Sequence, residues 1–187
     1  MRIISGNLKG KSINFLKSDT TRPLKDSVKE NIFNIILHSK LFNIDLINSN
    51  VLDLYSGIGS FGLECISRGA KKITFVEKDK KAAEILNKNL EHLSIQDKAE
   101  MITDDITHFL SRKISSKFEV IFLDPPYKKN DYISDLQLMQ KNKIYKKNHI
   151  IIIHRERKSH EDVEKIINPL IIRQYGRSKI IFGKFLG

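Results

Sequence analysis

The chain has 187 residues, of which 40% are hydrophobic and 29% are charged, and its formal net charge is +11. This length and composition are typical of a soluble globular domain with a real core, and no apolar run approaches membrane-spanning length. The only cysteine is Cys65, which excludes an internal disulfide, and the N-terminus carries no signal-peptide pattern, so we expect a cytoplasmic protein.

The positive charge favours a polyanionic partner, because phosphates bind Lys and Arg side chains with release of counterions. The alternative is compositional. The chain is also rich in Lys, Ile and Asn, which a genome poor in G and C produces without selection for binding. Charge therefore favours a nucleic acid before any motif is considered.

The chain begins with two short patterns. Residues 1–20 alternate in polarity and contain two glycines, so they predict a small hairpin or an extended arm. After a loop, apolar residues recur at helical spacing and predict a helix over residues 28–39. We therefore expect an N-terminal appendage, residues 1–45, that contacts RNA, and a main domain, residues 46–187.

Strands and helices alternate in the main domain. The expected strands are residues 51–55, 73–76, 101–102, 120–123 and 150–153, and the last of these is wholly apolar, as interior strands are. The expected helices are residues 59–68, 80–93, 106–110, 132–139 and 161–167, followed by an antiparallel hairpin of residues 170–173 and 180–185. Repeated strand–helix units predict an α/β fold, in which a mostly parallel sheet has helices on both faces and binds ligands at the carboxyl ends of its strands.

An Asp-Pro-Pro-Tyr turn, residues 124–127, follows one of these strands. Its prolines fix φ and lack N–H groups, so nearby carbonyls can point at a ligand. A carboxylate and carbonyls accept hydrogen bonds and a tyrosine ring stacks, which suits a nucleobase with an exocyclic amine. Tyr127 could instead be a core aromatic residue, but Lys128 and Lys129 follow it directly and favour exposure.

A glycine-rich segment follows the first strand, with the pattern G-x-G-x-x-G formed by Gly57, Gly59 and Gly62. Such glycines permit a tight turn and close approach of the backbone to a ligand. The pattern fits a dinucleotide site and an S-adenosylmethionine site equally well. Glu77 could hold a ribose in either site, or could simply begin a helix.

Four acidic residues stand at or just after the ends of the first four strands. A dinucleotide brings phosphates, which an acidic rim repels, whereas S-adenosylmethionine brings a sulfonium and an ammonium group, which it attracts. Helix capping is an adequate alternative for Asp105 but a poor one for Asp53, which precedes the glycine turn. The four residues that favour S-adenosylmethionine are Asp53, Glu77, Asp105 and Asp124.

The glycine loop, the acidic end of the second strand and the Asp-Pro-Pro-Tyr turn resemble Rossmann-like class I S-adenosylmethionine-dependent methyltransferases that act on exocyclic amines. The N-terminal residues sharpen the match, because residues 2–6, 9–11 and 22–34 resemble the signature of the RsmD family. Members of that family are 16S rRNA guanine-N2 methyltransferases. Residues 53–70 and 124–127 continue the resemblance, which spans most of the chain.

The resemblance implies S-adenosylmethionine as methyl donor, with 16S rRNA or the assembling small ribosomal subunit as partner, and we expect a monomer. The cofactor would be held by Asp53, Ser56, Gly57, Gly59, Glu77, which takes the ribose hydroxyls, and Asp105, which takes the adenine amine. Substrate handling would fall to Asp124, Pro125 and Tyr127. The RNA surface would include Lys9, Lys11, Arg22, Lys25, Lys29, Lys128, Lys129, Arg155 and Arg157.

The sequence departs from the family pattern at three places: Leu24 replaces the usual threonine, Lys29 the usual arginine, and residues 154–156 a more acidic stretch. His154 and His160 have no third ligand at metal spacing, so no metal is expected. Two alternatives stay open, a DNA or other RNA amine methyltransferase such as an adenine-N6 enzyme, and a non-catalytic RNA-binding factor. A nicotinamide oxidoreductase is more distant, because a second catalytic domain is missing.

Overall fold

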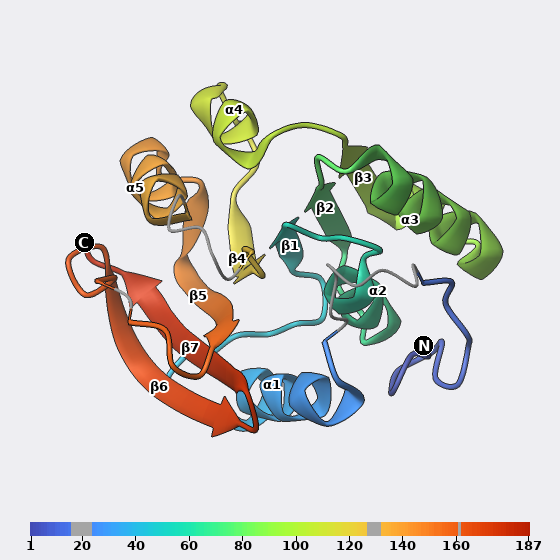
Figure 1. The fold of residues 1–187 in the computed structure, drawn as a ribbon, viewed down its shortest axis with the longest axis horizontal. Coiled ribbons are helices and arrows are strands. Elements are labelled where there is room, and N and C mark those ends of the chain that lie inside the picture. The colour runs from blue at the N-terminus through green and yellow to red at the C-terminus, as the bar shows by residue number, and fades with distance from the viewer. Residues whose placement is uncertain (16–23, 127–131, 161) are drawn as a thin grey trace.

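The computed structural model describes residues 1–15, 24–126, 132–160 and 162–187. A single seven-stranded sheet forms its centre, with helices on both faces (Figure 1). The strands are β1 Asn50–Leu54, β2 Lys72–Val76, β3 Ala99–Ile102, β4 Phe118–Leu123, β5 Tyr145–Glu156, β6 Ile167–Tyr175 and β7 Ser178–Phe185. The helices are α1 Asp26–His38, α2 Ser60–Ser67, α3 Lys80–Leu93, the short η1 Gln96–Lys98, α4 Ile106–Ser111 and α5 Tyr132–Asn142.

The strand order is β3-β2-β1-β4-β5-β7-β6. Strands β1 to β5 are parallel to their neighbours, and β7 runs antiparallel to both β5 and β6. The predicted α/β fold and its closing antiparallel hairpin are therefore confirmed. The chain moves outward from β1 to β3 and then returns to place β4 on the other side of β1, so the order reverses between β1 and β4, where ligands bind in such sheets.

Two apolar layers hold the helices to the sheet, because successive strand residues point to opposite faces. Val51, Val120 and Ile150 face the layer that includes α1, α2 and α3, whereas Leu52 and Ile121 face the layer that includes α4 and α5. Strand β5 lies between two neighbours, and its four consecutive isoleucines are fully buried. Its predicted interior position is confirmed.

The helix expected at residues 161–167 is wrong. Among the described residues of this stretch, 164–166 form a turn, and β6 begins at Ile167. Pro169 is a physical reason, because a proline disfavours helical geometry in the residue before it and so turns the chain toward an extended path. The apolar residues that suggested a helix, Val163 and Ile166, are buried against the α4–α5 side of the sheet.

The N-terminal segment forms a tight hairpin, with one antiparallel bridge between Arg2 and Ser12. Its backbone N–H groups at Ile4 and Ser5 each donate to the Glu64 carboxylate of α2 at 2.9 Å. The buried side chains of this hairpin and of α1 belong to the same apolar layer as α2, so the core is continuous across residue 45. The division at that residue stays a prediction. Among the described helices, none is both long and apolar enough to cross a membrane.

Candidate active site

The glycine loop after β1 is fixed to the end of β2 by backbone hydrogen bonds. Ser56 N donates to the Val76 carbonyl at 3.2 Å, and Gly57 N donates to Glu77 Oε2 at 2.8 Å. Gly57 and Gly59 have φ values of +55° and +83°, in the left-handed region that favours glycine. A Cβ on Gly59 would lie 2.4 Å from Leu86 Cδ1, whereas one on Gly57 would meet nothing within 4 Å. Gly59 is therefore required for packing, and Gly57 leaves an open side.

Glu77 lies where the sequence predicts it, directly after β2 and beside the glycine loop. One carboxylate oxygen accepts from Gly57 N and the other from Asp79 N, both at 2.8 Å. These bonds fix the orientation of the carboxylate, and each oxygen retains a lone pair for a further donor. Its assignment to the ribose hydroxyls is compatible with this geometry and stays a prediction.

The sequence interpretation of Asp53 needs a correction. The sequence makes contact with a helix a poor explanation for this residue, but the structure shows such a contact. Its side chain is 1% exposed and accepts a hydrogen bond from Gly62 N in the first turn of α2 at 2.9 Å. Its pKa is raised to about 8, mainly by burial and to a lesser extent by the charges of Asp124 and Glu77, against the opposing effect of the Gly62 bond. At neutral pH a buried carboxyl with this pKa is mostly protonated. The acidic rim therefore consists of Glu77, Asp105 and Asp124, without the Asp53 charge.

Asp105 is an exposed N-cap of α4, as the capping alternative allowed, and it accepts from Thr107 N at 3.0 Å. It also lines a cavity of about 40 Å³ at the carboxyl ends of the strands. Apolar faces and one carboxylate suit the edge of a flat ring with an exocyclic amine, but the cavity is smaller than a whole purine, so the predicted adenine contact stays a prediction. The other lining residues are Tyr55, Lys78, Ile106, Pro125, Pro126 and Tyr132.

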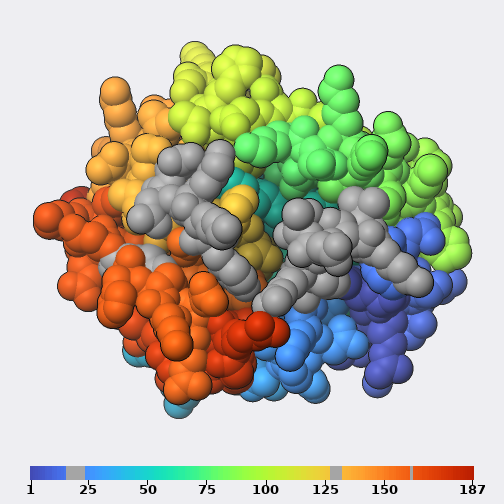
Figure 2. Space-filling view, in the orientation of Figure 1, coloured from blue at the N-terminus to red at the C-terminus, as the bar shows by residue number. Residues whose placement is uncertain are grey.

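Figure 2 shows this side of the molecule. The teal and gold segments, which include the ends of β1 and β4, are visible at the centre of the face, below α3 and α4. The register places Leu54 of β1 beside Leu123 of β4 and Val76 of β2. Three strand ends therefore bring the glycine loop, Glu77 and Asp124 together, as the sequence predicts.

The Ser56 side chain indicates whether the site suits a ligand. Its hydroxyl oxygen is buried and has no hydrogen-bond partner among the described residues. A buried polar atom without a partner costs free energy unless a ligand or water satisfies it. Together with the open side of Gly57 and the fixed carboxylate of Glu77, this hydroxyl fits a hydroxyl- and amine-bearing ligand such as S-adenosylmethionine.

Asp124 begins the proline turn, and its N–H donates to the Leu54 carbonyl of β1 at 3.4 Å. Its Oδ1 lies 2.9 Å from His154 Nδ1, and the side chain is 26% exposed. Arg155 Nη1 donates to the carbonyls of Pro125 and Pro126, at 3.3 and 3.1 Å. Tyr127 lies outside the described residues. The sequence interpretation missed the two β5 residues as partners of this turn, although the absence of N–H groups on two prolines indicates that donors must come from elsewhere.

The expected RNA surface is only partly exposed. Lys9, Lys11, Lys25 and Arg157 are exposed, and the first three come from the N-terminal hairpin and the start of α1. Arg22, Lys128 and Lys129 lie outside the described residues.

The RNA contacts predicted for Lys29 and Arg155 are wrong, because both side chains are buried. Lys29 is 0% exposed, and its ammonium lies 3.7 Å from the Glu64 carboxylate. Arg155 is 1% exposed, and its guanidinium lies 4.7 Å from the centre of the Tyr132 ring, besides its two proline carbonyls. Each charged side chain therefore interacts with groups inside the protein and not with RNA.

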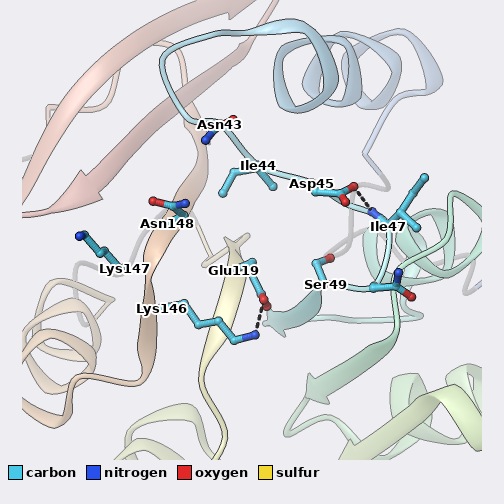
Figure 3. Close-up of a pocket in the computed structure, with 10 residues that line it drawn as sticks. Asn43, Ile44, Asp45, Ile47, Ser49, Glu119, Lys146, Lys147 and Asn148 are labelled. Carbon is cyan, nitrogen blue, oxygen red and sulfur yellow. Dashed lines mark hydrogen bonds and ion pairs between the residues drawn. The ribbon is translucent and has the colours of Figure 1, made fainter.

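A larger cavity, about 480 Å³, lies at the opposite edge of the sheet, by the amino ends of β4 and β5 (Figure 3). Its polar groups largely satisfy one another: Glu119 pairs with Lys146 and Asp45 accepts from Ile47 N at 2.9 Å. This cavity is remote from the strand ends that carry the motifs, so the smaller one marks the candidate site.

Within the described parts of the chain, no group of three His, Cys, Asp or Glu side chains could hold a metal ion.

Comparison with known structures supports the fold. The Escherichia coli protein yhhF, described as a candidate methyltransferase, superposes with a TM-score of 0.84 at 24% identity, covering 99% of this chain and 97% of that one. HI0767 from Haemophilus influenzae, described as a candidate methylase, gives a TM-score of 0.79 at 29% identity over 100% and 98% of the two chains. SMU.776, a candidate methyltransferase solved with S-adenosylhomocysteine, gives 0.66 at 16% identity over 83% and 49%.

Sequence comparison identifies the family. A family model described as "Conserved hypothetical protein 95" matches residues 1–184. Ribosomal RNA small subunit methyltransferase D from Buchnera aphidicola subsp. Acyrthosiphon pisum is 36% identical over 83% of this chain and 78% of the relative. The enzyme of the same name from Haemophilus influenzae is 36% identical over 84% and 79%. The predicted resemblance is thereby confirmed, and the chain belongs to the family of the ribosomal RNA small subunit methyltransferases D.

Proposed function

We propose that this protein transfers a methyl group from S-adenosylmethionine to the exocyclic N2 of a guanine in small-subunit ribosomal RNA. The observation that carries the proposal is the position of Asp124 at the end of β4, beside the end of β1 from which the glycine loop begins, in a chain whose relatives bear the name ribosomal RNA small subunit methyltransferase D. A cytoplasmic location, where ribosomes assemble, follows from it.

S-adenosylmethionine, when bound, supplies the methyl group on a positively charged sulfonium. The chain's own residues would orient it: Glu77 through the ribose hydroxyls, Asp105 through the adenine amine, and the Ser56 hydroxyl through a hydrogen bond that the protein leaves unmade. The negative charges of Glu77 and Asp105 favour the positive end of this molecule over a phosphate.

Asp124 would orient the target amine. The guanine must leave its stack, which costs a few kcal/mol, and Tyr127 would return about 1–3 kcal/mol by stacking. The Asp124 carboxylate and the Pro125 carbonyl would accept hydrogen bonds from N2 and relieve its positive charge as the N–C bond forms. The cofactor would supply the methyl group and its sulfur would keep the electron pair of the S–C bond, while N2 would lose one proton to Asp124 or to water. Alignment of nitrogen and methyl carbon would supply most of the acceleration.

The direct test is mass spectrometry of nucleosides from small-subunit rRNA of cells with and without the gene. We expect N2-methylguanosine to decrease by one residue per rRNA molecule in the deletion strain and to return with the gene. Purified protein with radiolabelled S-adenosylmethionine should then label small-subunit rRNA, and a comparison of naked rRNA with assembling particles identifies the substrate. An unchanged N2-methylguanosine content, or a loss of N6-methyladenosine instead, would contradict the proposal.

The Asp124→Ala variant separates chemistry from cofactor binding. Because Asp124 would contact the base rather than the cofactor, we expect methylation to fall at least about 100-fold while S-adenosylmethionine affinity, measured by calorimetry, changes less than about threefold. Asp162→Ala is the matched control, since the Asp162 side chain is 75% exposed and pairs with Lys165 on the surface. Equal losses of methylation and cofactor affinity would contradict the assigned role.

A further inference from the structure

We propose that His154 and Arg155 act together as positioning residues that hold the Asp124-Pro125-Pro126 turn from both faces of the sheet. We call these two residues the β5 clamp. The inference rests on the proposed function for its kinetic consequences, but its geometric basis is independent of the substrate.

The proline turn lacks hydrogen-bond donors of its own at Pro125 and Pro126. A proline has no backbone N–H, so Pro125 and Pro126 offer only carbonyl acceptors, and the ionised carboxylate of Asp124 also only accepts. A turn of acceptors at the end of a strand needs donors from neighbouring side chains to fix its orientation. The neighbouring strand is β5, and the register Leu123–Ile153 places its next two residues beside the turn.

His154 holds the carboxylate. It is 4% exposed and is fixed at both ring nitrogens, with Nδ1 at 2.9 Å from Asp124 Oδ1 and Nε2 at 2.9 Å from the Ser178 hydroxyl of β7. Because an ionised carboxylate only accepts, Nδ1 carries the proton in this pair. Oδ1 is thereby engaged, and Asp124 Oδ2 makes no hydrogen bond among the described residues. That oxygen is left for the target amine.

Arg155 holds the proline carbonyls. Successive strand residues point to opposite faces, so its side chain leaves the sheet on the face opposite to His154. There the guanidinium donates to both carbonyls and lies against the Tyr132 ring of α5. A planar guanidinium with fixed donors can bind two carbonyls at once, which a lysine ammonium does less specifically. The Pro125 carbonyl that would face the target amine is therefore fixed in direction.

The clamp explains why two polar residues are buried directly after the four isoleucines of β5. A misplacement of about 1 Å at a reacting group can cost 100-fold in rate. Removal of either donor should therefore lower kcat and leave the KM for S-adenosylmethionine nearly unchanged, since the bonds described above join these residues to the proline turn and to β7.

The test compares four variants in the full-length protein. His154→Leu and Arg155→Met should each lower kcat by about 10- to 100-fold with KM for the cofactor within about twofold of wild type. His154→Asn should recover most of the lost rate, because its amide nitrogen can replace Nδ1 as donor to Asp124. The control is His149→Leu. His149 lies in the same strand, is also 4% exposed, and bonds to backbone atoms of Lys146 and Phe185, away from the proline turn, so its loss should lower the melting temperature without changing kcat.

Crystal structures of His154→Leu and Arg155→Met separate this inference from the proposed function. We expect the Asp124 side chain to rotate in the first variant and the proline carbonyls to shift in the second. An unchanged turn in both variants would overturn the clamp whatever the substrate is. A kcat of His154→Asn as low as that of His154→Leu would also overturn it. So would a kcat loss in His149→Leu as large as the loss in His154→Leu. An inactive wild-type protein that keeps the clamp geometry would contradict only the proposed function.

Discussion

Asp53 carries an ionisable group in the middle of the apolar layer between β1 and α2. Its pKa is raised from its ordinary value of 3.8 to about 8, mainly by burial. In the folded protein the carboxyl therefore binds a proton over a pH range in which the unfolded chain has released it. The stability that this group contributes is fully present below about pH 3.8 and is lost as the pH rises toward 8.

The Asp53→Asn variant should remove this pH dependence. An asparagine has the same shape and keeps an oxygen that can accept from Gly62 N, but it does not ionise. We expect the free energy of unfolding of wild type minus variant to decrease between pH 5 and pH 8, as measured by urea unfolding at several pH values. A difference that stays constant over this range would show that the carboxyl is ionised throughout.

Single residues show which part of the site could be predicted. The glycines and acids at strand ends were predictable because local chemistry determines them: a glycine where φ is positive, an acid where a strand ends. Lys29 was predicted wrongly, although it lies four residues before Phe33 and seven before Ile36, on the apolar stripe of α1. Its partner Glu64 is 35 positions away on another helix, and sequence spacing gives no information about such a contact.

Among the helices, α2 anchors the N-terminal hairpin through one buried carboxylate. Glu64 is 0% exposed and accepts from Ile4 N, Ser5 N and Arg68 Nε, each at 2.9 Å. The ammonium of Lys29 lies 3.7 Å away, and burial lowers the pKa of Lys29 while Glu64 and Asp26 raise it. The hairpin and α1 therefore depend on a charge in α2.

The Glu64→Gln variant should cost roughly 3–5 kcal/mol of unfolding free energy, because it removes the buried charge partner of Lys29 and directs an amide N–H toward other donors. Glu100→Gln is the matched control. It removes an exposed pair with Lys72, at 3.1 Å on the surface, and should cost at most about 1 kcal/mol. Equal costs in urea unfolding would show that the buried carboxylate does not anchor the hairpin.

The strands and most helices were predictable because their apolar periodicity is strong and each is flanked by clear boundaries. Helix α3 shows this well: Asp79 accepts from Ala82 N at 2.9 Å as its N-cap, and Ser94 ends it in the left-handed conformation. The stretch after β5 was not predictable in the same way. Its few apolar residues fit a helix, but residues 164–166 form a turn and β6, which pairs with β7, begins at Ile167.

The molecule as a whole is strongly positive but has a local group of negative side chains. Its net charge is +11, yet Glu77, Asp105 and Asp124 lie together at the carboxyl edge of the sheet. Composition predicted the overall sign and the strand ends predicted the acidic rim. Which lysines remain exposed could not be predicted, because this depends on how the N-terminal hairpin packs against α2.

The three exposed lysines of the N-terminal part test the predicted RNA surface. If Lys9, Lys11 and Lys25 contact phosphates, their joint replacement by Ala should weaken rRNA binding and reduce the slope of log K against log salt by about two to three. Cofactor affinity should stay unchanged, because none of the three lines the cavity beside Asp105. The control replaces Lys71 and Lys147, which are exposed at the amino ends of β2 and β5. If those two lysines change the slope as much per residue, binding follows net charge alone and the N-terminal part is not a specific RNA surface.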